Sequence, residues 1–368
     1  MQNFYQFVDE SYTAYHAAKN IGKILEKKGF KEGLNNGSKF YITFDGAVAA
    51  FIKPKKIKRL KMFHAHTDSP ALKLKPNAEF HLENMSMLAV EVYGAPLLSS
   101  WTNRDLKIAG RDGDGKLIAL KELATLPQLA IHLDRDVNEK GLVLNLQSHL
   151  NLLTGIKSLP KGPYDLFAVS NEKVEVLGQD LVQGPRLDNL ASCYQILEAL
   201  ETSSDSLITA FFFNHEEIGS SSHQGAESAR FAHILERVVG DRKEYLELLE
   251  NAVAISIDVA HAVHPNYPEK HDPRHPVFLG KGIAVKWSAK QKYATDATGA
   301  KYFKNYQNYV SRNDIPSGST VGPIQSTLLG VKTIDIGIPI LSMHSIREII
   351  SLKDHLAMID ALKKIIKL

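Results

Sequence analysis

The chain has 368 residues, of which 44% are hydrophobic and 23% charged, which predicts an ordinary globular protein with a sizeable core and more than one domain. The formal net charge of +3 gives no strong argument for a nucleic-acid partner. The basic run 53–61 leads into an apolar strand, which favours a solvated loop over a patch that binds polyanions. The single cysteine, Cys193, excludes an internal disulfide, and we see neither a signal peptide nor a membrane span, so we expect a cytoplasmic protein without membrane partners.

The first predicted elements are a long helix and a hairpin. Apolar residues recur at helical spacing over residues 3–28. Two strands, 39–42 and 47–52, flank the dipeptide Asp45-Gly46, which is a strong hairpin signal.

The next predicted strand, 59–65, leads into two histidines. Alternation places the side chains of His64 and His66 on the same side of the strand. Asp68 follows two residues later, where it can accept a hydrogen bond from an imidazole whose other nitrogen binds a metal. We therefore interpret His66 as a candidate metal ligand.

From about residue 72 to 177, short alternating segments separated by turn residues predict a mostly antiparallel β domain. We interpret it as an insertion at 73–177 between the two parts of an α/β domain, 1–72 and 178–368. The strands expected in it are 79–82, 88–93, 116–120, 129–133, 142–146 and 167–169.

Two apolar strands of the second half end in acids. Residues 207–213 lead to the adjacent carboxylates of Glu216 and Glu217, and residues 252–257 lead to Asp258. Adjacent carboxylates repel each other unless a positive charge lies beside them, and a metal ion supplies that charge. Glu217 can then be a ligand while Glu216 stays free to accept a proton, although the pair taken alone is as well explained by exposure to solvent.

The remaining elements of the second half supply further polar ends. Asp188, before a helix that extends to about residue 200, is by itself better explained as an N-cap, yet its carboxylate could also coordinate through both oxygens. We expect a helix over 300–314 and a strand over 331–338 that leads to His344. The last helix, 352–368, is amphipathic, with an expected core face made of Leu356, Ile359, Leu362 and Ile366.

These polar ends are expected to form one metal site, because the carboxyl ends of strands in an open α/β sheet converge on one crevice. Oxygen and imidazole donors without thiolates suit zinc, cobalt or manganese. Five ligands exceed the needs of one four-coordinate zinc, so two ions that share a bridging carboxylate fit better. The candidate ligands are His66, Asp188, Glu217, Asp258 and His344.

At this point the chain resembles the aspartyl aminopeptidase and vacuolar aminopeptidase I family of di-metal exopeptidases. The matching stretches follow the family's order along most of the chain, and together they are highly specific. They are His66-Thr67-Asp68-Ser69-Pro70, Arg104-Asp105-Leu106, Leu129-Ala130-Ile131-His132-Leu133, Arg186-Leu187-Asp188-Asn189-Leu190, Glu216-Glu217-Ile218-Gly219-Ser220, Ala260-His261-Ala262-Val263-His264-Pro265-Asn266-Tyr267, Lys290-Gln291-Lys292-Tyr293-Ala294 and Met343-His344-Ser345-Ile346-Arg347-Glu348.

The resemblance implies a three-layer α/β metallo-exopeptidase domain with an inserted, mostly β dimerisation domain. It implies removal of N-terminal residues from peptides with two divalent ions, zinc or else cobalt or manganese. It also implies dimers that assemble into a tetrahedral dodecamer. By this resemblance one ion takes His66 and Asp258, the other takes Glu217 and His344, and Asp188 bridges both.

The same resemblance implies roles for four further residues. Glu216 is the general base, and Asp68 orients His66. His132 reaches into the neighbouring subunit's site and steadies the oxyanion of the reaction. Lys286 corresponds to a lysine that pairs with an N-terminal Asp or Glu of the substrate, and a broader or apolar preference stays open.

Departures from the family pattern are local, such as Ala65 where the family often has glycine. Two rival functions remain at this stage. Another co-catalytic metallohydrolase, such as a deacylase or carboxypeptidase, would keep the metals but would not need a free substrate amine. An idle assembly or binding protein would be expected to have lost Glu216 or a ligand, and all are present.

Overall fold

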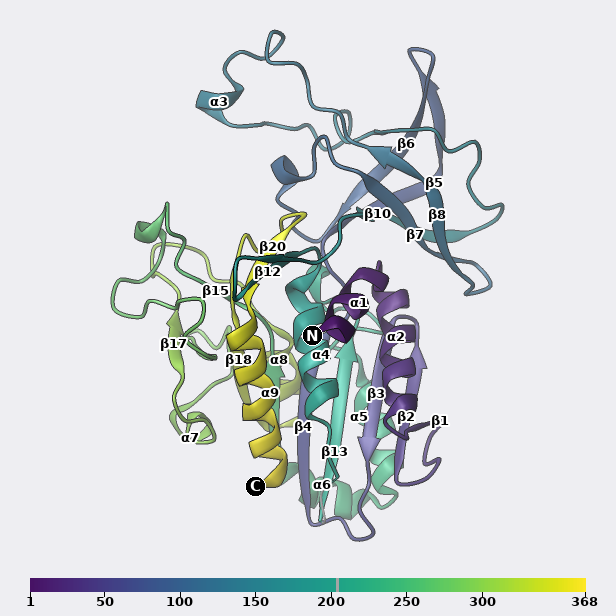
Figure 1. The fold of residues 1–368 in the computed structure, drawn as a ribbon. Coiled ribbons are helices and arrows are strands. Elements are labelled where there is room, and N and C mark those ends of the chain that lie inside the picture. Colours follow the sequence, from purple (N-terminus) through teal and green to yellow (C-terminus); the bar gives the residue numbers. More distant parts are fainter. Residues whose placement is uncertain (203–204) are drawn as a thin grey trace.

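The computed structural model describes residues 1–202 and 205–368, and its largest unit is a three-layer α/β domain (Figure 1). The mixed sheet has the order β1-β2-β3-β13-β4-β14-β18-β16-β17, and β13, β4, β14 and β18 run parallel in its middle. The strand bounds are β1 (Lys31–Glu32), β2 (Lys39–Phe44), β3 (Ala47–Ile52), β4 (Arg59–His66), β13 (Ser206–Phe213), β14 (Val253–Ile257), β16 (Ala284–Trp287), β17 (Gln307–Val310) and β18 (Lys332–Gly337).

Helices cover both faces of this sheet, and alternation along the strands supplies two separate cores. In β3, Val48 and Ala50 pack with the first helix set, and Ala49 and Phe51 pack with the second. The first set is α1 (Gln2–Glu10), α2 (Ala14–Lys27), α4 (Leu187–Ala199) and α9 (Leu352–Lys367); the second is α5 (Ala229–Val239), α6 (Arg242–Glu250) and α8 (Val321–Leu329). None of the helices in the described residues combines the length and the apolar composition that a membrane span needs.

A separate closed β barrel lies at one end of the α/β domain, at the top of Figure 1. The chain enters it from β4 and leaves it toward α4, so the barrel is inserted as expected. The boundaries 73–177 stay a prediction, since the barrel strands themselves begin at Ala71 and end at Ser170. In sheet order the strands are β10 (Tyr164–Ser170), β5 (Ala71–Leu82), β6 (Met85–Tyr93), β9 (Leu152–Thr154), β8 (Leu117–Thr125) and β7 (Leu106–Asp112).

A smaller sheet lies between the α/β domain and the barrel in Figure 1. Two of its strands precede Asp188 in the sequence, one follows Asp258, and two flank His344. The sheet therefore brings loops of the second half together at one edge of the main sheet. The order is β11 (Glu175–Leu177), β12 (Leu181–Gly184), β20 (Glu348–Ser351), β19 (Pro339–Leu341) and β15 (Ala260–His261). The short helices are η1 (Leu98–Ser100), α3 (Val137–Lys140), η2 (Glu216–Ile218), η3 (Pro268–Lys270) and α7 (Ala297–Ala300).

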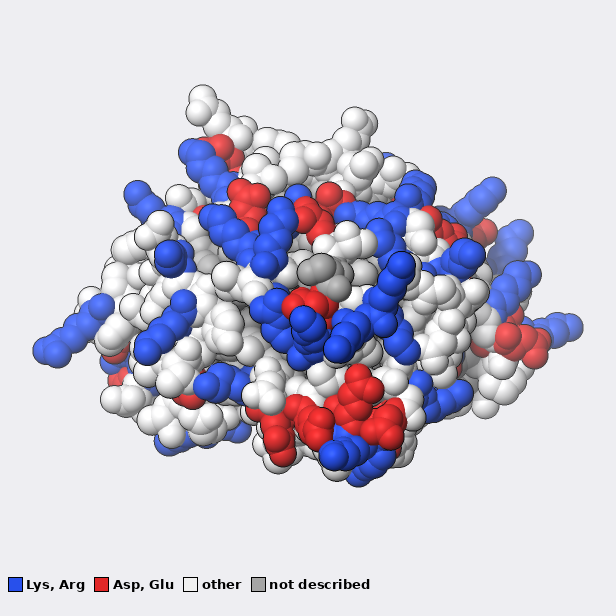
Figure 2. Space-filling model, turned by 90° about the horizontal axis from the view of Figure 1, so that it is seen from below, with Lys and Arg blue, Asp and Glu red and all other residues white. Residues whose placement is uncertain are grey.

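The basic run 53–61 connects β3 to β4 at the end opposite the barrel. Figure 2 shows this face, where Asp and Glu side chains lie among the Lys and Arg side chains. Arg59 pairs with Asp205 at 2.9 Å, and Lys61 is buried and donates to the carbonyl oxygens of Ile365 and Ile366. The run is therefore only partly the predicted solvated loop, since its last three residues begin β4 and Lys61 is buried there, and the acidic side chains on this face (Figure 2) do not favour a polyanion-binding patch.

Two predictions in the first half differ from the structure. The helix expected over 3–28 is broken between α1 and α2, where Ser11 ends the first helix and Thr13, whose backbone is extended, precedes the second as its N-cap, a position that Thr favours. The segments 129–133 and 142–146, expected to be strands, are irregular. Their backbones pair with no strand among the described residues, and most of their apolar side chains are exposed.

Two predictions in the second half are also wrong. The region expected to be a helix, 300–314, contains the end of α7 and the strand β17, which pairs with β16. Asn305, between them, has a left-handed backbone conformation that a helix does not allow. Leu356 is 50% exposed and lies off the buried face of α9, whereas Ile359, Leu362 and Ile366 are buried as expected.

Candidate metal centre

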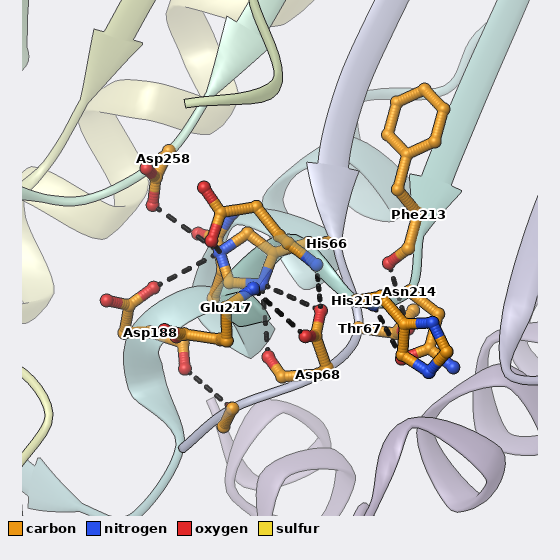
Figure 3. Close-up of polar contacts among 12 residues, drawn as sticks. His66, Thr67, Asp68, Asp188, Phe213, Asn214, His215, Glu217 and Asp258 are labelled. Carbon is orange, nitrogen blue, oxygen red and sulfur yellow. Dashed lines mark hydrogen bonds and ion pairs between the residues drawn. The ribbon is translucent and has the colours of Figure 1, made fainter. Parts of the chain in front are cut away.

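The candidate metal centre lies at the carboxyl edge of the main sheet. His66 is the last residue of β4, Glu216 and Glu217 follow β13 in the one-turn helix η2, and Asp258 follows β14 (Figure 3). Because β13, β4 and β14 are parallel neighbours, their carboxyl ends meet at this edge. The register of the sheet therefore brings together side chains that are far apart in the sequence.

Asp188 lies between the two histidines of the cluster. Its Oδ1 is 3.4 Å from His66 Nε2, and its Oδ2 is 3.4 Å from His344 Nε2. The carboxylate comes from the first turn of α4 and is buried. One oxygen toward each imidazole is the arrangement that a carboxylate shared by two ions requires.

The other two carboxylates divide between the histidines. Asp258 Oδ1 lies 3.8 Å from His66 Nε2, and Glu217 Oε2 lies 3.4 Å from His344 Nε2. Two donors that are each about 2.1 Å from a tetrahedral zinc ion are separated by about 3.4 Å, so these spacings suit two adjacent ions.

Both imidazoles present an Nε2 lone pair to this cluster. His66 Nδ1 is 3.0 Å from the carbonyl oxygen of Asp68, and His344 Nδ1 is 3.1 Å from that of Ala95. Because a carbonyl oxygen only accepts hydrogen bonds, each neutral ring carries its proton on Nδ1. An Nε2 lone pair facing a carboxylate oxygen is repulsive unless a proton or a metal ion lies between them. Each of these contacts is therefore a place for a cation, and the oxygen and imidazole donors fit divalent metal ions.

Burial makes the carboxylates of the cluster poor anions on their own. Glu217 Oε1 is buried and accepts no hydrogen bond from the described residues. Burial and the nearby charge of Asp188 raise the pKa of Glu217 well above its usual range, although His344 lowers it in part. A divalent cation would favour the ionised carboxylate and lower this pKa again.

Glu216 lies beside the same histidine as Asp258, at nearly the same distance. Its Oε2 lies 3.9 Å from His66 Nε2. Burial raises the pKa of Glu216 to about 8; His66 opposes this shift, and Asp258 adds to it. As for Glu217, a divalent cation nearby would lower this pKa again and favour the ionised carboxylate, which is the form that accepts a proton.

Asp68 has a wider role than the sequence indicated. Its main-chain carbonyl meets His66 Nδ1, and its carboxylate Oδ1 lies 3.4 Å from the same nitrogen. The carboxylate also accepts hydrogen bonds from the backbone N–H groups of Glu216 and Glu217, at 3.2 and 3.1 Å. Asp68 thus holds the turn that carries the proposed base as well as the imidazole.

Lys286, on β16, belongs to the wall of the same pocket. Its Nζ is 3.4 Å from Asp258 Oδ2 and 5.3 Å from the centre of the Tyr293 ring. The side chain is buried, and Tyr309 and Ser319 line the pocket beside it. The ammonium group therefore contacts a candidate metal ligand within the wall of the pocket that the candidate ligands also line.

His132 is not brought to the centre of its own chain. It is exposed on the segment between β8 and β9, which extends away from the barrel around α3 at the upper left of Figure 1. Cys193, by contrast, is buried as expected. Its Sγ donates to the carbonyl oxygen of His66 at 2.9 Å, and burial raises the pKa of the thiol to about 12, which agrees with a structural role.

Sequence reasoning missed one buried acid beneath the ligands. Glu348 Oε2 accepts from the backbone N–H of Asp188 at 2.9 Å, and Oε1 accepts from that of His344 at 2.8 Å. This carboxylate fixes the main chain of two candidate ligands relative to each other. Its place in the stretch 343–348 carried no signal of that role, because the contact depends on how β20 packs against α4.

The chain is similar to proteins of one family. A sequence profile described as "Aminopeptidase I zinc metalloprotease (M18)" matches residues 7–163 and 163–365. A Clostridium novyi (strain NT) protein described as "Probable M18 family aminopeptidase 2" is 37% identical over 408 aligned residues, covering 95% of this chain and 94% of that protein.

Solved structures share the fold. An M18-family aminopeptidase from Thermotoga maritima has a TM-score of 0.86 at 25% identity and covers 100% of this chain and 95% of its own. A structure described as the S. cerevisiae mApe1 dodecamer has a TM-score of 0.76 at 24% identity and covers 99% of this chain and 95% of its own.

Proposed function

Because the chain belongs to the M18 family of zinc metallo-aminopeptidases, we propose that the cluster at the carboxyl edge of its sheet is the catalytic centre for N-terminal peptide cleavage. The observation that carries the proposal is the position of Asp188, with one oxygen 3.4 Å from each of two histidine Nε2 atoms. A single buried carboxylate between two imidazoles is most simply explained as a bridge between two ions.

The spacing supports one assignment of the ligands. His66 and Asp258 would hold one ion, Glu217 and His344 the other, and Asp188 both. Zinc is the family's metal, and cobalt or manganese suits the same oxygen and imidazole donors. When bound, such ions polarise the scissile carbonyl and make water a nucleophile at neutral pH.

Glu216 is proposed as the general base. Its carboxylate would accept a proton from the attacking water and return it to the leaving amine, and the turn held by Asp68 keeps it over the pocket. The 3.9 Å separation from His66 Nε2 would also allow Glu216 to be a ligand, so a variant has to separate the two roles.

The test of the proposal replaces each adjacent acid with its amide. We expect Glu216→Gln to lower kcat by about 10²- to 10⁴-fold while two ions per subunit stay bound. Glu217→Gln is the contrasting variant and should lose metal as well as activity. Metal content by mass spectrometry and turnover of peptides with free and N-acetylated termini are the measurements.

Two results would contradict the proposal. Loss of metal from Glu216→Gln would make Glu216 a ligand. Cleavage of only the acetylated peptides would indicate a deacylase.

The proposal extends to substrate and assembly. An acidic N-terminal residue is the proposed preference, supported by the buried ammonium of Lys286 in the pocket wall. The barrel is proposed to form dimers, and these a dodecamer in a cytoplasmic enzyme. The assembly is supported by exposed apolar side chains on the segment between β8 and β9, namely Leu129 (59%), Ile131 (45%), Leu133 (73%), Val143 (83%) and Leu146 (56%).

A further inference from the structure

The last strand residue of β6 connects the barrel to the metal centre. Tyr93 donates a hydrogen bond from its hydroxyl to Asp68 Oδ2 at 2.7 Å, across the boundary between the two domains. Both side chains are buried, with 9% of Tyr93 and 3% of Asp68 exposed. A short hydrogen bond to a buried carboxylate is among the stronger kinds in proteins.

The contact acts on both acids of the turn through Asp68. The carboxylate that receives the Tyr93 hydroxyl also accepts the N–H groups of Glu216 and Glu217, at 3.2 and 3.1 Å. Without the hydroxyl, the carboxylate would lose its shortest hydrogen bond and be held only by the longer contacts to the two N–H groups and to His66. The proposed base and one proposed ligand would then be held less firmly.

The residues after Tyr93 contact the other half of the centre. The carbonyl oxygen of Ala95 meets His344 Nδ1 at 3.1 Å, and the N–H of Leu97 donates to the carbonyl oxygen of His344 at 2.8 Å. At Gly94, with φ +73°, an added Cβ would lie 3.1 Å from the Cβ of Glu217. The barrel strand thus continues into a segment that packs on two proposed ligands.

We propose that Tyr93 is a positioning residue of the metal centre and that the segment 93–97 makes the inserted barrel part of the catalytic apparatus. This inference rests on the proposed function, since it presumes that Glu217 and His344 hold a metal. Its physical basis is that partners behind the ligands fix their orientation and raise metal affinity.

The ordinary alternative is that Tyr93 only packs the barrel. Its ring is perpendicular to that of Phe167, with centroids 5.4 Å apart, so the aromatic body has a structural role of its own. Tyr93→Phe keeps this packing and removes only the hydroxyl. Any effect of that variant on metal affinity therefore belongs to the contact with Asp68.

The experiment compares Tyr93→Phe with Tyr164→Phe. Tyr164 also bonds through its hydroxyl, but to the backbone of Lys75 and Ala78 within the barrel. Zinc affinity is measured by competition with a chromogenic chelator, and steady-state kinetics are measured on the metal-saturated enzyme. We expect Tyr93→Phe to lose roughly ten- to a hundredfold in zinc affinity and in kcat, with KM within about twofold of the parent, and Tyr164→Phe to lose neither.

A second pair of variants tests the packing on Glu217. Gly94→Ala places a methyl group against that ligand at positive φ, whereas Gly115→Ala, at φ +82°, meets nothing within 4 Å. The backbone strain is similar, so a loss of zinc affinity in Gly94→Ala alone would be due to the contact.

Equal zinc affinity and kcat in Tyr93→Phe and Tyr164→Phe would overturn the inference. The Glu216→Gln and Glu217→Gln results keep this failure separate from failure of the proposed function. If those variants behave as expected while Tyr93→Phe is unchanged, only the role of Tyr93 is wrong.

Discussion

Lys286 is the residue on which the substrate preference depends. A buried ammonium group needs a negative partner, and Asp258 at 3.4 Å supplies one within the protein. Asp258 raises the pKa of Lys286 against the effect of burial, so the side chain stays charged in the pocket wall. A substrate carboxylate would be a second partner for the same charge.

We expect Lys286→Met to change selectivity as well as rate. For a peptide that begins with Asp, kcat/KM should fall at least about tenfold more than for one that begins with Leu, which corresponds to about 1.4 kcal/mol of lost discrimination. The exposed Lys292, on the segment that carries Tyr293, provides the control as Lys292→Met. Equal losses with both peptides would mean that Lys286 supports Asp258 and does not read the substrate.

The individual ligands could be predicted from the sequence, because their residue types and their positions after apolar strands indicate metal-binding chemistry. An apolar run that ends in His66, Glu217 or Asp258 indicates a strand end with a donor, and the sheet register then brings the three together. The supporting contacts were not accessible in this way. Tyr93 and Glu348 act through contacts to residues 25 and 160 positions away, and nothing in their local sequence indicates a partner.

Elements were predicted well where burial and periodicity agree. The strands β3 and β4 and the helix α9 have strong local patterns, and the structure confirms them within about two residues. The segments 129–133 and 142–146 show the opposite case. Their alternation is that of a strand, but a strand also needs a neighbour for its backbone hydrogen bonds, and sequence alternation alone does not supply one.

The helix α9 offers a direct test of the corrected packing face. Leu362 is fully buried against the main sheet, whereas Leu356 is 50% exposed. Leu362→Ala should lower the free energy of unfolding by about 2–5 kcal/mol, because it removes buried methyl groups and leaves a cavity. Leu356→Ala should change that free energy by no more than about 0.5 kcal/mol.

Urea unfolding of the metal-free protein measures both changes without the contribution of bound zinc. Equal destabilisation by the two substitutions would return Leu356 to the core face that the sequence first indicated. The comparison is matched, since the same side chain is truncated to alanine in one helix.

On the scale of the whole molecule, the barrel has two ends with different roles. Its near end meets the α/β domain through an ion pair of Arg111 with Asp45 at 2.6 Å, and Asp165 of the neighbouring barrel strand β10 pairs with the same arginine at 3.2 Å. Its far end carries the exposed apolar segment and His132 (Figure 1). A near end held to the α/β domain and a far end with exposed apolar side chains suit the proposed role of the barrel in dimer formation.

If His132 acts in the neighbouring subunit, two inactive variants should complement each other. A subunit with His132→Ala keeps its own Glu216, and a partner with Glu216→Gln keeps its own His132. In a mixed dimer, the site of the first subunit would contain both groups, while the site of the second would contain neither. Each variant alone has no complete site.

Co-expression in equal amounts gives a quantitative expectation. Random pairing makes about half of the dimers mixed, and one of the two sites in each is complete, so about a quarter of the parental activity should return. In a dodecamer almost every particle contains both kinds of subunit, so purification by both tags in succession removes single-variant particles and leaves the expectation at about a quarter. Activity no higher than the sum of the separate variants would place His132 outside the partner's site, and full activity of His132→Ala alone would remove it from the reaction.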